Sequence, residues 1–229
     1  MAASDKEQTM NGYSFEFSGA SFRALPSGGL WWPDADLLCV SDLHLGKSSR
    51  IARRSGTIML PPYETEETLS RLDADLALCR PKSVICLGDS FDDDETIGEL
   101  SEATQLWLLR MQAGRSWYWV EGNHDPGGIA PGGTHRFEIE QDGVIFRHIA
   151  ERSAVSEISG HYHPKITVSG KAGHTTRPCF VYDNERLILP AYGAYTGGLR
   201  ATDRAIRSLL GQDARAIMTG TIAVELPIP

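Results

Sequence analysis

The feature that most constrains the fold is an alternation of short apolar runs with longer amphipathic segments in the first half of the sequence. Three runs have the composition of buried strands, namely Asp36–Ser41, Lys82–Leu87 and Ser116–Val120. Between them, Pro61–Arg80 and Thr96–Ala113 carry apolar residues at helical spacing. Strands that alternate with helices in this way predict a parallel β-α-β-α-β sheet.

Beyond residue 122 the pattern changes to short strands with little helix between them. We expect strands over Arg136–Glu140, Val144–His148, Val155–Ser159, Lys165–Ser169, Cys179–Tyr182 and Leu187–Leu189. A last helix over Ala201–Leu210 and a closing strand over Thr221–Leu226 follow, and Tyr13–Phe17 and Ser21–Leu25 are expected as early strands. The sequence therefore predicts an α/β fold of four layers, an αββα sandwich in which two packed mixed sheets are flanked by helices.

The length of 229 residues suits one full-size domain, which we place at residues 13–229 after a polar, flexible tail at residues 1–12. No apolar run is long enough to span a bilayer, and the N-terminus lacks the features of a secretory signal. The four cysteines are scattered without a C-x-x-C pair, which favours buried, reduced thiols: Cys39, Cys79, Cys86 and Cys179. These features together predict a cytoplasmic protein without a membrane partner.

Net charge places a limit on nucleic-acid binding. The chain has 22 basic and 30 acidic residues, a balance of −8, which argues against a broad basic surface that coats nucleic acid. The balance says less about an active site, where bound metal ions supply local positive charge.

Each of the three expected strands ends in a cluster of polar residues. The clusters are Asp42-Leu43-His44, Gly88-Asp89-Ser90-Phe91-Asp92 and Gly122-Asn123-His124-Asp125. In the second half, His148 ends one strand and Gly160-His161-Tyr162-His163 ends the next. Groups at the carboxyl ends of parallel strands converge on one crevice, so we expect these side chains to meet.

The residue types in these clusters are ligands of first-row divalent metals. Carboxylates combined with imidazoles suit manganese, iron or zinc, whereas calcium requires oxygen ligands only. In an extended segment, residues two apart project to the same side, so the D-x-H and H-x-H pairs could each reach one ion. A glycine precedes a ligand in three clusters, where a sharp turn or a close backbone approach is required: Gly88, Gly122 and Gly160.

The whole constellation resembles the calcineurin-like metallophosphoesterase superfamily. The motifs D-x-H, G-D-x-x-D, G-N-H-D, a lone strand histidine and G-H-x-H occur in that order between Asp42 and His163. Five of the seven histidines fall within these motifs, which makes a chance match improbable. The resemblance implies a sandwich fold of the metallophosphoesterase type and the hydrolysis of phosphate esters at two divalent metal ions.

The resemblance also implies a role for each motif residue. One metal would be held by Asp42, His44 and His163, and the other by Asn123, His148 and His161, with Asp89 as the bridge between them. His124 would protonate the leaving alkoxide, and Asp125 would orient its imidazole. Two assignments keep an alternative: His148 could be an ordinary strand histidine, and Asp92 either fixes a ligand or belongs to a solvated acidic turn.

A narrower resemblance, to the bacterial ligase-associated DNA-repair phosphoesterases, comes from the segments around the motifs. These segments are Asp42–Arg50, Leu60–Tyr63, Gly88–Phe91, Gly160–Lys165 and Leu189–Gly198. It implies a DNA-repair nuclease or phosphodiesterase with an ATP-dependent DNA ligase and a helicase as partners. Manganese is then the expected metal, with iron or zinc as alternatives. That family often has histidine where this chain has Asp92, a departure that bears on the substrate and not on metal binding.

Contacts to the substrate are predicted in two places. Lys47, Arg50, Arg53 and Arg54 form a basic cluster after the first motif that could meet phosphates flanking the scissile one, or could be a solvated face. Asp92 is a further candidate for a substrate contact. In the glycine-rich segment near the end, Tyr192 and Tyr195 could stack on bases or simply pack.

Two other functions stay open at this point. The same chemistry could serve a phosphodiesterase or phosphatase for small nucleotides or other phosphate esters. A non-catalytic binding module on the same fold is the second alternative. Such a module should have lost ligands or the acid, and this chain retains Asp89, Asn123 and His124.

Overall fold

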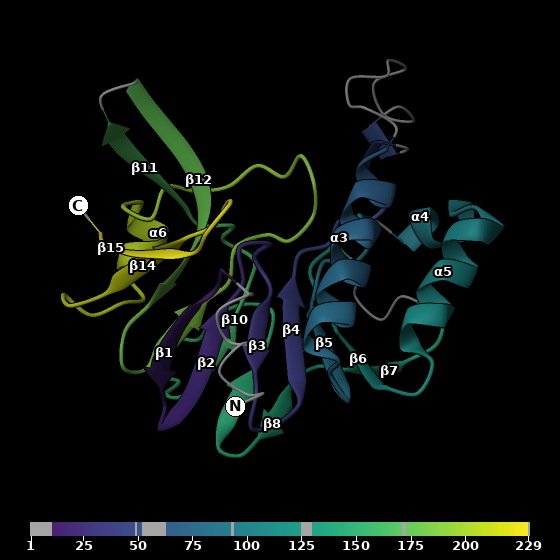
Figure 1. Ribbon diagram of the computed structural model, residues 1–229, viewed down its shortest axis with the longest axis horizontal. Helices are drawn as coiled ribbons and strands as arrows, with labels where there is room; N and C mark the ends of the chain where they lie inside the picture. Colours follow the sequence, from purple (N-terminus) through teal and green to yellow (C-terminus); the bar gives the residue numbers. More distant parts are fainter. Residues whose placement is uncertain are drawn as a thin grey trace, which may run out of the picture.

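Two β-sheets pack face to face in the computed structural model. The longer helices cover the outer face of the first sheet, and one short helix lies on the outer side of the second (Figure 1). The structure describes residues 11–48, 50–51, 63–92, 94–124, 130–170 and 173–228. The predicted tail at residues 1–12 lies outside this part of the chain except for its last two residues. The backbone carbonyl of Asn11 accepts a hydrogen bond from Ala223.

The first sheet has seven strands in sequence order. They are β1 (Tyr13–Phe17), β2 (Ala20–Ala24), β3 (Leu30–Trp32), β4 (Leu37–Ser41), β5 (Ser83–Leu87), β6 (Ser116–Val120) and β7 (Thr134–Arg136). Strands β1 to β4 pair antiparallel, and β4 to β7 pair parallel. The predicted parallel order β4-β5-β6 is therefore confirmed.

The helices of this half run between the parallel strands. Helix α3 (Glu64–Cys79) follows β4 along the chain, and α4 (Asp94–Glu99) and α5 (Glu102–Gln112) follow β5. The prediction of a single helix over Thr96–Ala113 is wrong, because the helix is interrupted at Ser101. Ser101 leaves the helical conformation, at φ −57° and ψ 150°, and its side chain caps α5 by accepting a hydrogen bond from the Thr104 amide.

The second sheet has the order β15-β14-β12-β13-β10-β9-β8, and β11 pairs with β12 at its edge. Its strands are β8 (Ile139–Gln141), β9 (Val144–Phe146), β10 (Glu157–Ser159), β11 (Lys165–Gly170), β12 (Gly173–Tyr182), β13 (Arg186–Ile188), β14 (Arg215–Met218) and β15 (Val224–Pro227). Two strands, β3 and β14, had no counterpart in the sequence prediction. The long β11–β12 hairpin projects away from the sheets (Figure 1).

Two predictions in this half need correction. The strand expected over Arg136–Glu140 is two strands, since β7 joins the first sheet and β8 the second. The helix expected over Ala201–Leu210 is only the four residues of α6 (Arg204–Arg207), where the Asp203 side chain caps the first turn. Neither correction affects the layers, so the predicted sandwich of two mixed sheets flanked by helices is confirmed.

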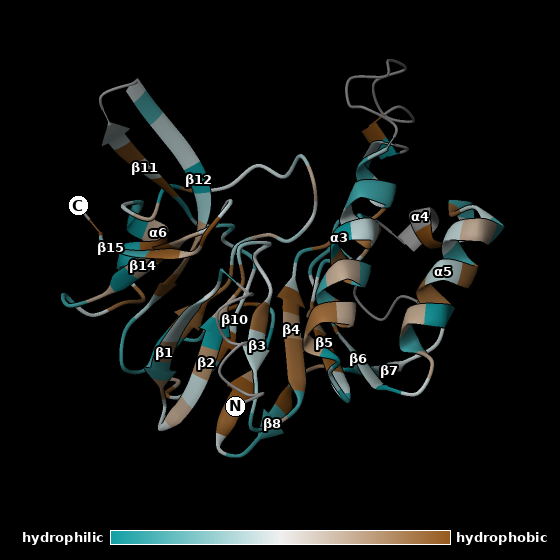
Figure 2. Ribbon diagram, viewed as in Figure 1, coloured by the Kyte–Doolittle hydropathy of each residue, from teal (hydrophilic) through white to brown (hydrophobic). Residues whose placement is uncertain are grey.

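The layers follow from side-chain alternation along the central strands. On β4, Leu37 and Cys39 face the second sheet, and Leu38 and Val40 face the helices. Because both faces of β4 are covered, the strand is hydrophobic along its whole length (Figure 2). A third cluster packs around Ile206 on the outer side of the second sheet.

The cysteines belong to these cores and form no disulfide. Cys39, Cys86 and Cys179 are buried, and Cys79 is partly buried on α3, as predicted for reduced core thiols. Among the helices that the structure describes, none is long and apolar enough to cross a membrane.

Candidate metal centre

The polar clusters of the sequence meet where the two sheets come together at the carboxyl ends of their strands. The first sheet supplies residues that follow β4, β5 and β6: Asp42, His44, Asp89, Asn123 and His124. The second sheet supplies residues that follow β9 and β10: His148, His161 and His163. These residues form two neighbouring groups of metal-ligand type.

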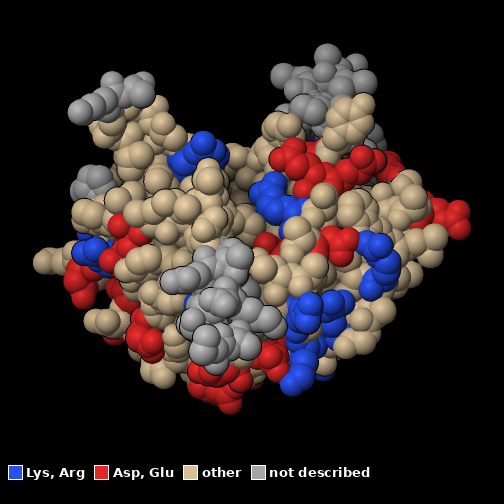
Figure 3. All heavy atoms as spheres, viewed as in Figure 1, with Lys and Arg blue, Asp and Glu red and all other residues tan. Residues whose placement is uncertain are grey.

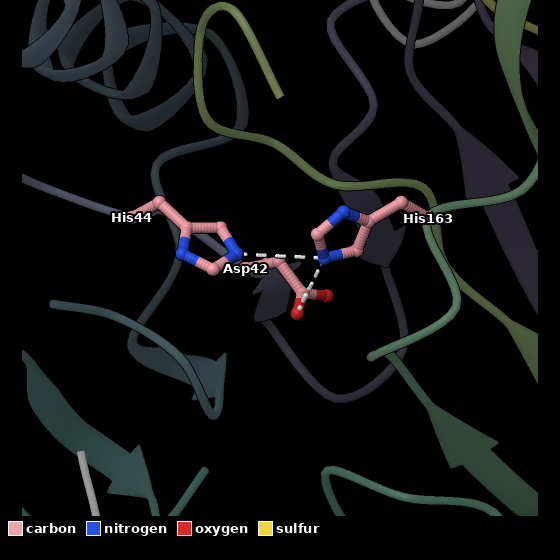
Figure 4. A group of neighbouring side chains, drawn as sticks. All are labelled: Asp42, His44 and His163. Atoms are coloured by element: carbon pink, nitrogen blue, oxygen red, sulfur yellow. Dashed lines mark hydrogen bonds and ion pairs between the residues drawn. The ribbon is translucent and has the colours of Figure 1, made fainter. Parts of the chain in front are cut away.

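The first group consists of Asp42, His44 and His163 (Figure 4). Nε2 of His163 lies 3.0 Å from Oδ1 of Asp42 and 3.5 Å from Nε2 of His44. Asp42 and His44 are buried, and the side chain of His163 is 16% exposed. Three ligand atoms therefore converge from two sheets on one point, as predicted for this group.

The Asp42 carboxylate shows that this group fits a metal. Its Oδ2 accepts hydrogen bonds from the Ser41 hydroxyl at 2.5 Å and from the His161 amide at 3.0 Å. Its Oδ1 is buried, has Nε2 of His163 at 3.0 Å, and is otherwise without a hydrogen-bond partner in the described part of the chain. Ligands about 2.1 Å from one ion lie roughly 3.0–3.5 Å from one another, which is the spacing found here.

The second group consists of Asp89, His148 and His161, with Asn123 beside them. Nε2 of His148 is 3.3 Å from Oδ2 of Asp89, 3.3 Å from Nδ1 of His161 and 3.1 Å from Oδ1 of Asn123. His148 therefore faces the other ligands and does not behave as an ordinary strand histidine. Because the second oxygen of Asp89 accepts the His124 amide at 2.8 Å, its role as a bridge stays a prediction.

Charges in the second group shift the pKa values of its members in opposite directions. Burial raises the pKa of the Asp89 carboxyl, but the hydrogen bond and charge of His148 outweigh it and lower this pKa to about 2. Burial lowers the pKa of His148, but Asp89 and Asp42 outweigh it and raise this pKa to about 9. Burial followed by the charge of His148 lowers the pKa of His161. Without a metal, a proton on His148 thus neutralises part of the carboxylate charge.

Acceptors behind two of the histidines set their orientation. Nδ1 of His44 donates to Oδ1 of Asp92 at 2.9 Å, and Nδ1 of His148 donates to the Leu87 carbonyl at 2.9 Å. Because these acceptors hold the Nδ1 proton, each ring presents Nε2 to its ligand group.

The environment of Asp92 corrects one predicted substrate contact. The Asp92 side chain is fully buried, and its second oxygen accepts a hydrogen bond from Nε of Arg50. Asp92 therefore fixes His44, which agrees with one of the two predicted alternatives. Because it is buried, Asp92 does not face a substrate. Arg50 bonds Asp92 through Nε of its guanidinium, and its predicted contact with a flanking phosphate stays a prediction.

The backbone at the ligands is left-handed, which corrects the reason given for the D-x-H and H-x-H spacing. The φ angles are positive at five ligand residues: Asp42 at 54°, His44 at 46°, Asp89 at 46°, His161 at 71° and His163 at 47°. Such angles are uncommon outside glycine and concentrate at functional sites. The chain thus turns sharply at each ligand, and the paired ligands do not lie on an extended segment.

The glycines before two ligands allow close backbone approach, as predicted. A Cβ at Gly88 would lie 2.4 Å from Nδ1 of His148. A Cβ at Gly160 would lie 1.8 Å from the Ser41 hydroxyl and 2.6 Å from Oδ2 of Asp42. Any side chain at either position would displace a ligand.

The predicted acid, His124, lies at the rim of the centre. Its side chain is 35% exposed, its Nδ1 donates to the Asp92 carbonyl at 3.2 Å, and its Nε2 is 4.0 Å from Oδ2 of Asp89. The ring thus meets both solvent and the second ligand group. Asp125, the predicted partner of His124, lies outside the described residues.

The remaining predicted substrate contacts have different outcomes. Arg53 and Arg54 lie outside the described residues, and Lys47 is partly exposed. Tyr192 is fully buried, and its hydroxyl donates to Asp75 at 2.8 Å, so it cannot stack on a base as one prediction had it. Tyr195 is 52% exposed.

Two supporting residues were missed by the sequence reasoning. Ser41 donates to Asp42, and Gly193 donates its amide to the Asp42 carbonyl at 3.0 Å. Ser41 directly precedes the first motif, a position that could have drawn attention to it. Gly193 is 151 positions from Asp42 by their numbers, and only the resemblance over Leu189–Gly198 marked its segment.

The fold and the two ligand groups define a metal-dependent phosphoesterase. The chain belongs to the calcineurin-like phosphoesterase family, whose family model matches residues 35–188. The crystal structure of nuclease MPE from Pseudomonas putida is similar to this chain, with a TM-score of 0.70 and 24% sequence identity. The match covers 94% of this chain and 100% of that one. No curated protein matches the sequence significantly.

Proposed function

We propose that this phosphoesterase is a nuclease that hydrolyses phosphodiester bonds of DNA. The observation that carries the proposal is the placement of two ligand groups side by side with His124 at their rim. The groups are in direct contact, since the amide of His161 donates to Asp42. Two divalent ions held there would polarise the phosphoryl oxygens and lower the pKa of a water molecule that attacks phosphorus.

The residues around the centre can assist the departure of an alkoxide, which is the leaving group of a DNA strand and also of alkyl monoesters. Cleavage of a DNA strand releases an alkoxide, which is a poor leaving group unless it is protonated. His124 supplies a partly exposed imidazole next to Asp89. The Asp92 carbonyl accepts its Nδ1 proton, so Nε2 is the nitrogen that faces Asp89. The preference for a DNA diester is supported by the similarity to a protein described as a nuclease.

Manganese is the proposed metal, and a DNA-repair system with a DNA ligase and a helicase is the proposed setting in the cytoplasm. Mixed carboxylate and imidazole donors also suit iron and zinc, and the ion bound in cells depends on availability as well as on ligands. Metal analysis of protein purified without added metal would show which ion it carries. Co-purification with a ligase would support the partnership.

The activity is tested on metal-stripped protein that is reloaded with manganese, iron or zinc. The substrates are single-stranded DNA, duplex DNA, bis-p-nitrophenyl phosphate and p-nitrophenyl phosphate. We expect diesters to be cleaved faster than the monoester and at least one DNA form to be cleaved. Asp89→Asn should abolish turnover, whereas the exposed His174→Ala should leave it unchanged.

The net charge of −8 favours a second candidate, a phosphodiesterase for small nucleotides. Cleavage of bis-p-nitrophenyl phosphate and dinucleotides without cleavage of any DNA form would establish that activity and disprove the nuclease. A faster rate on the monoester would identify a phosphatase.

A further inference from the structure

The segment that joins β13 to α6 passes the metal centre and forms one wall of a separate cavity. Hydrogen bonds fix it at three points: the Gly193 amide donates to the Asp42 carbonyl at 3.0 Å, the Ala194 amide to Thr68 Oγ1 at 2.9 Å, and Lys165 Nζ to the Thr196 carbonyl at 2.9 Å. Residues 193–196 are therefore held between the first ligand group and the cavity.

The cavity has a volume of about 510 Å³ and lies between α3, β12 and this segment. Its walls combine charged, aromatic and small residues, among them Arg71, Arg177, Tyr195, Thr196 and Gly193. Cavities of this size hold small organic ligands, typically at roughly 300–1,000 Å³. There is room for one nucleotide.

The walls carry more positive than negative charge. Arg177 is exposed on β12, and Arg71 on α3 donates to the Tyr192 carbonyl at 3.1 Å. Glu67 also lines the cavity and lies 3.6 Å from Arg71, so two guanidinium groups oppose one carboxylate. Basic side chains are visible on both sides of the hollow between the β11–β12 hairpin and α3 (Figure 3). A phosphate would be attracted to this place although the whole chain is acidic.

Tyr195 adds an exposed aromatic ring to these charges. Its side chain is 52% exposed although its neighbours on both sides are hydrogen-bonded to the fold. Its φ angle of 55° is left-handed, a conformation that a tyrosine adopts at a cost and that recurs at ligand-binding positions. An exposed ring at this position is available to stack on a nucleobase.

We propose that this cavity is a second nucleotide subsite, which binds a phosphate and a base of the strand whose scissile bond lies at the metal centre. The inference rests on the proposed nuclease function. Gly193 contacts Asp42 and also lines the cavity, so a single chain segment separates the two sites. A subsite that shares a chain segment with the metal centre favours a strand, which could occupy both sites, over a free nucleotide.

The test compares Arg177→Gln and Tyr195→Ala with the unchanged chain loaded with manganese. For a single-stranded oligonucleotide, KM should rise about fivefold or more in Tyr195→Ala, because a stacked base is lost. Arg177→Gln should weaken binding and reduce the slope of log K against log salt by about 0.7, because one phosphate contact is lost. The kcat on bis-p-nitrophenyl phosphate should stay the same, and Tyr195→Phe should bind normally.

Arg80→Gln is the matched control, because Arg80 is exposed at the other end of α3. If Arg177→Gln and Tyr195→Ala bind the oligonucleotide as Arg80→Gln does, the subsite is disproved while the nuclease stands. Equal losses on the oligonucleotide and on bis-p-nitrophenyl phosphate would also disprove it. If the unchanged chain cleaves bis-p-nitrophenyl phosphate but neither binds nor cleaves an oligonucleotide, the nuclease proposal fails and the subsite with it.

Discussion

Single residues outside the ligand set control how the ligands are presented. Asp92 is the clearest case, because it joins three parts of the centre. Its carboxylate holds His44 and Arg50, and its backbone carbonyl accepts Nδ1 of His124. The orientation of a ligand and that of the proposed acid thus depend on one buried residue.

Asp92→Asn should lower metal affinity by about 10- to 100-fold, since it removes the carboxylate that fixes a ligand imidazole. Titration of metal-stripped protein with manganese, followed by calorimetry, measures the effect. Asp34→Asn is the control, because Asp34 is exposed in the turn before β4. Equal affinity in Asp92→Asn and the unchanged chain would show that His44 is oriented by other groups.

His124→Ala should slow DNA cleavage by about 10²- to 10⁴-fold without changing metal affinity, because general acid catalysis is worth that factor. The loss should be much smaller for bis-p-nitrophenyl phosphate, whose p-nitrophenolate leaves without needing a proton. Comparing kcat on the two substrates separates an acid from a residue that merely supports the fold. Equal losses on both substrates would contradict the role of His124 as acid.

At the scale of elements, the strands position the ligands by ending abruptly. Immediately after β4, β5 and β10 the backbone turns into left-handed conformations, and the ligand side chains lie in these turns. Such turns need close backbone approach, and the approach is tightest at Gly160, which touches Ser41 and Asp42 across the two sheets.

Gly160→Ala should destabilise the protein by about 1–3 kcal/mol, because the added methyl group overpacks a buried contact. Urea unfolding of the metal-free protein measures this change. Gly98→Ala is the control, because Gly98 lies in α4 with open space around it and should become up to about 1 kcal/mol more stable. Unaltered stability of Gly160→Ala would mean that the turn has room to shift.

The sequence predicted the elements that bury both faces and missed those defined by distant partners. Strands β4, β5 and β6 were found to within one residue because parallel, doubly covered strands are continuous apolar runs. Strand β3 has only three residues and depends on β2 and β4 for its pairing. The break between β7 and β8 could not be predicted from the sequence. The alternation of apolar and polar residues along a strand does not indicate which sheet the strand joins.

The same distinction applies to the site. The ligands were found from residue type, order and spacing, which are local properties of the sequence. The link between Asp92 and Arg50 joins residues 42 positions apart. Whether Tyr192 stacks on a base or packs was left open, and Asp75, 117 positions away, holds it in the core. Contacts at such separations depend on the packed fold.

For the whole molecule, charge at the boundary of the two sheets links stability to pH. The pKa of His148 is raised to about 9 in the fold from 6.5, so its protonation stabilises the metal-free protein fully below pH 6.5. This stabilisation is lost as pH rises from 6.5 to about 9, on the order of 3 kcal/mol. Urea unfolding in chelator at the two ends of this range measures the loss.

Two comparisons test whether His148 is responsible. Bound metal requires a neutral imidazole, so manganese-loaded protein should lack this decline with pH. His148→Gln should also lack it in chelator. A decline of the same size in His148→Gln would assign the pH dependence to other groups.

A metal ion held by either ligand group would cross-link the two halves of the chain, because each group draws its residues from both sheets. His44 and His163, which face each other in the first group, are 119 residues apart. Removal of the metal by a chelator should increase local opening of the two sheets at this edge. Amide hydrogens of β9 and β10 should then exchange faster, while those of β1 and β2 keep their rates. Equal exchange with and without metal would show that the sheets hold together unaided. In a cell short of metal, the protein would then lose activity and also become easier for proteases to open at this one edge.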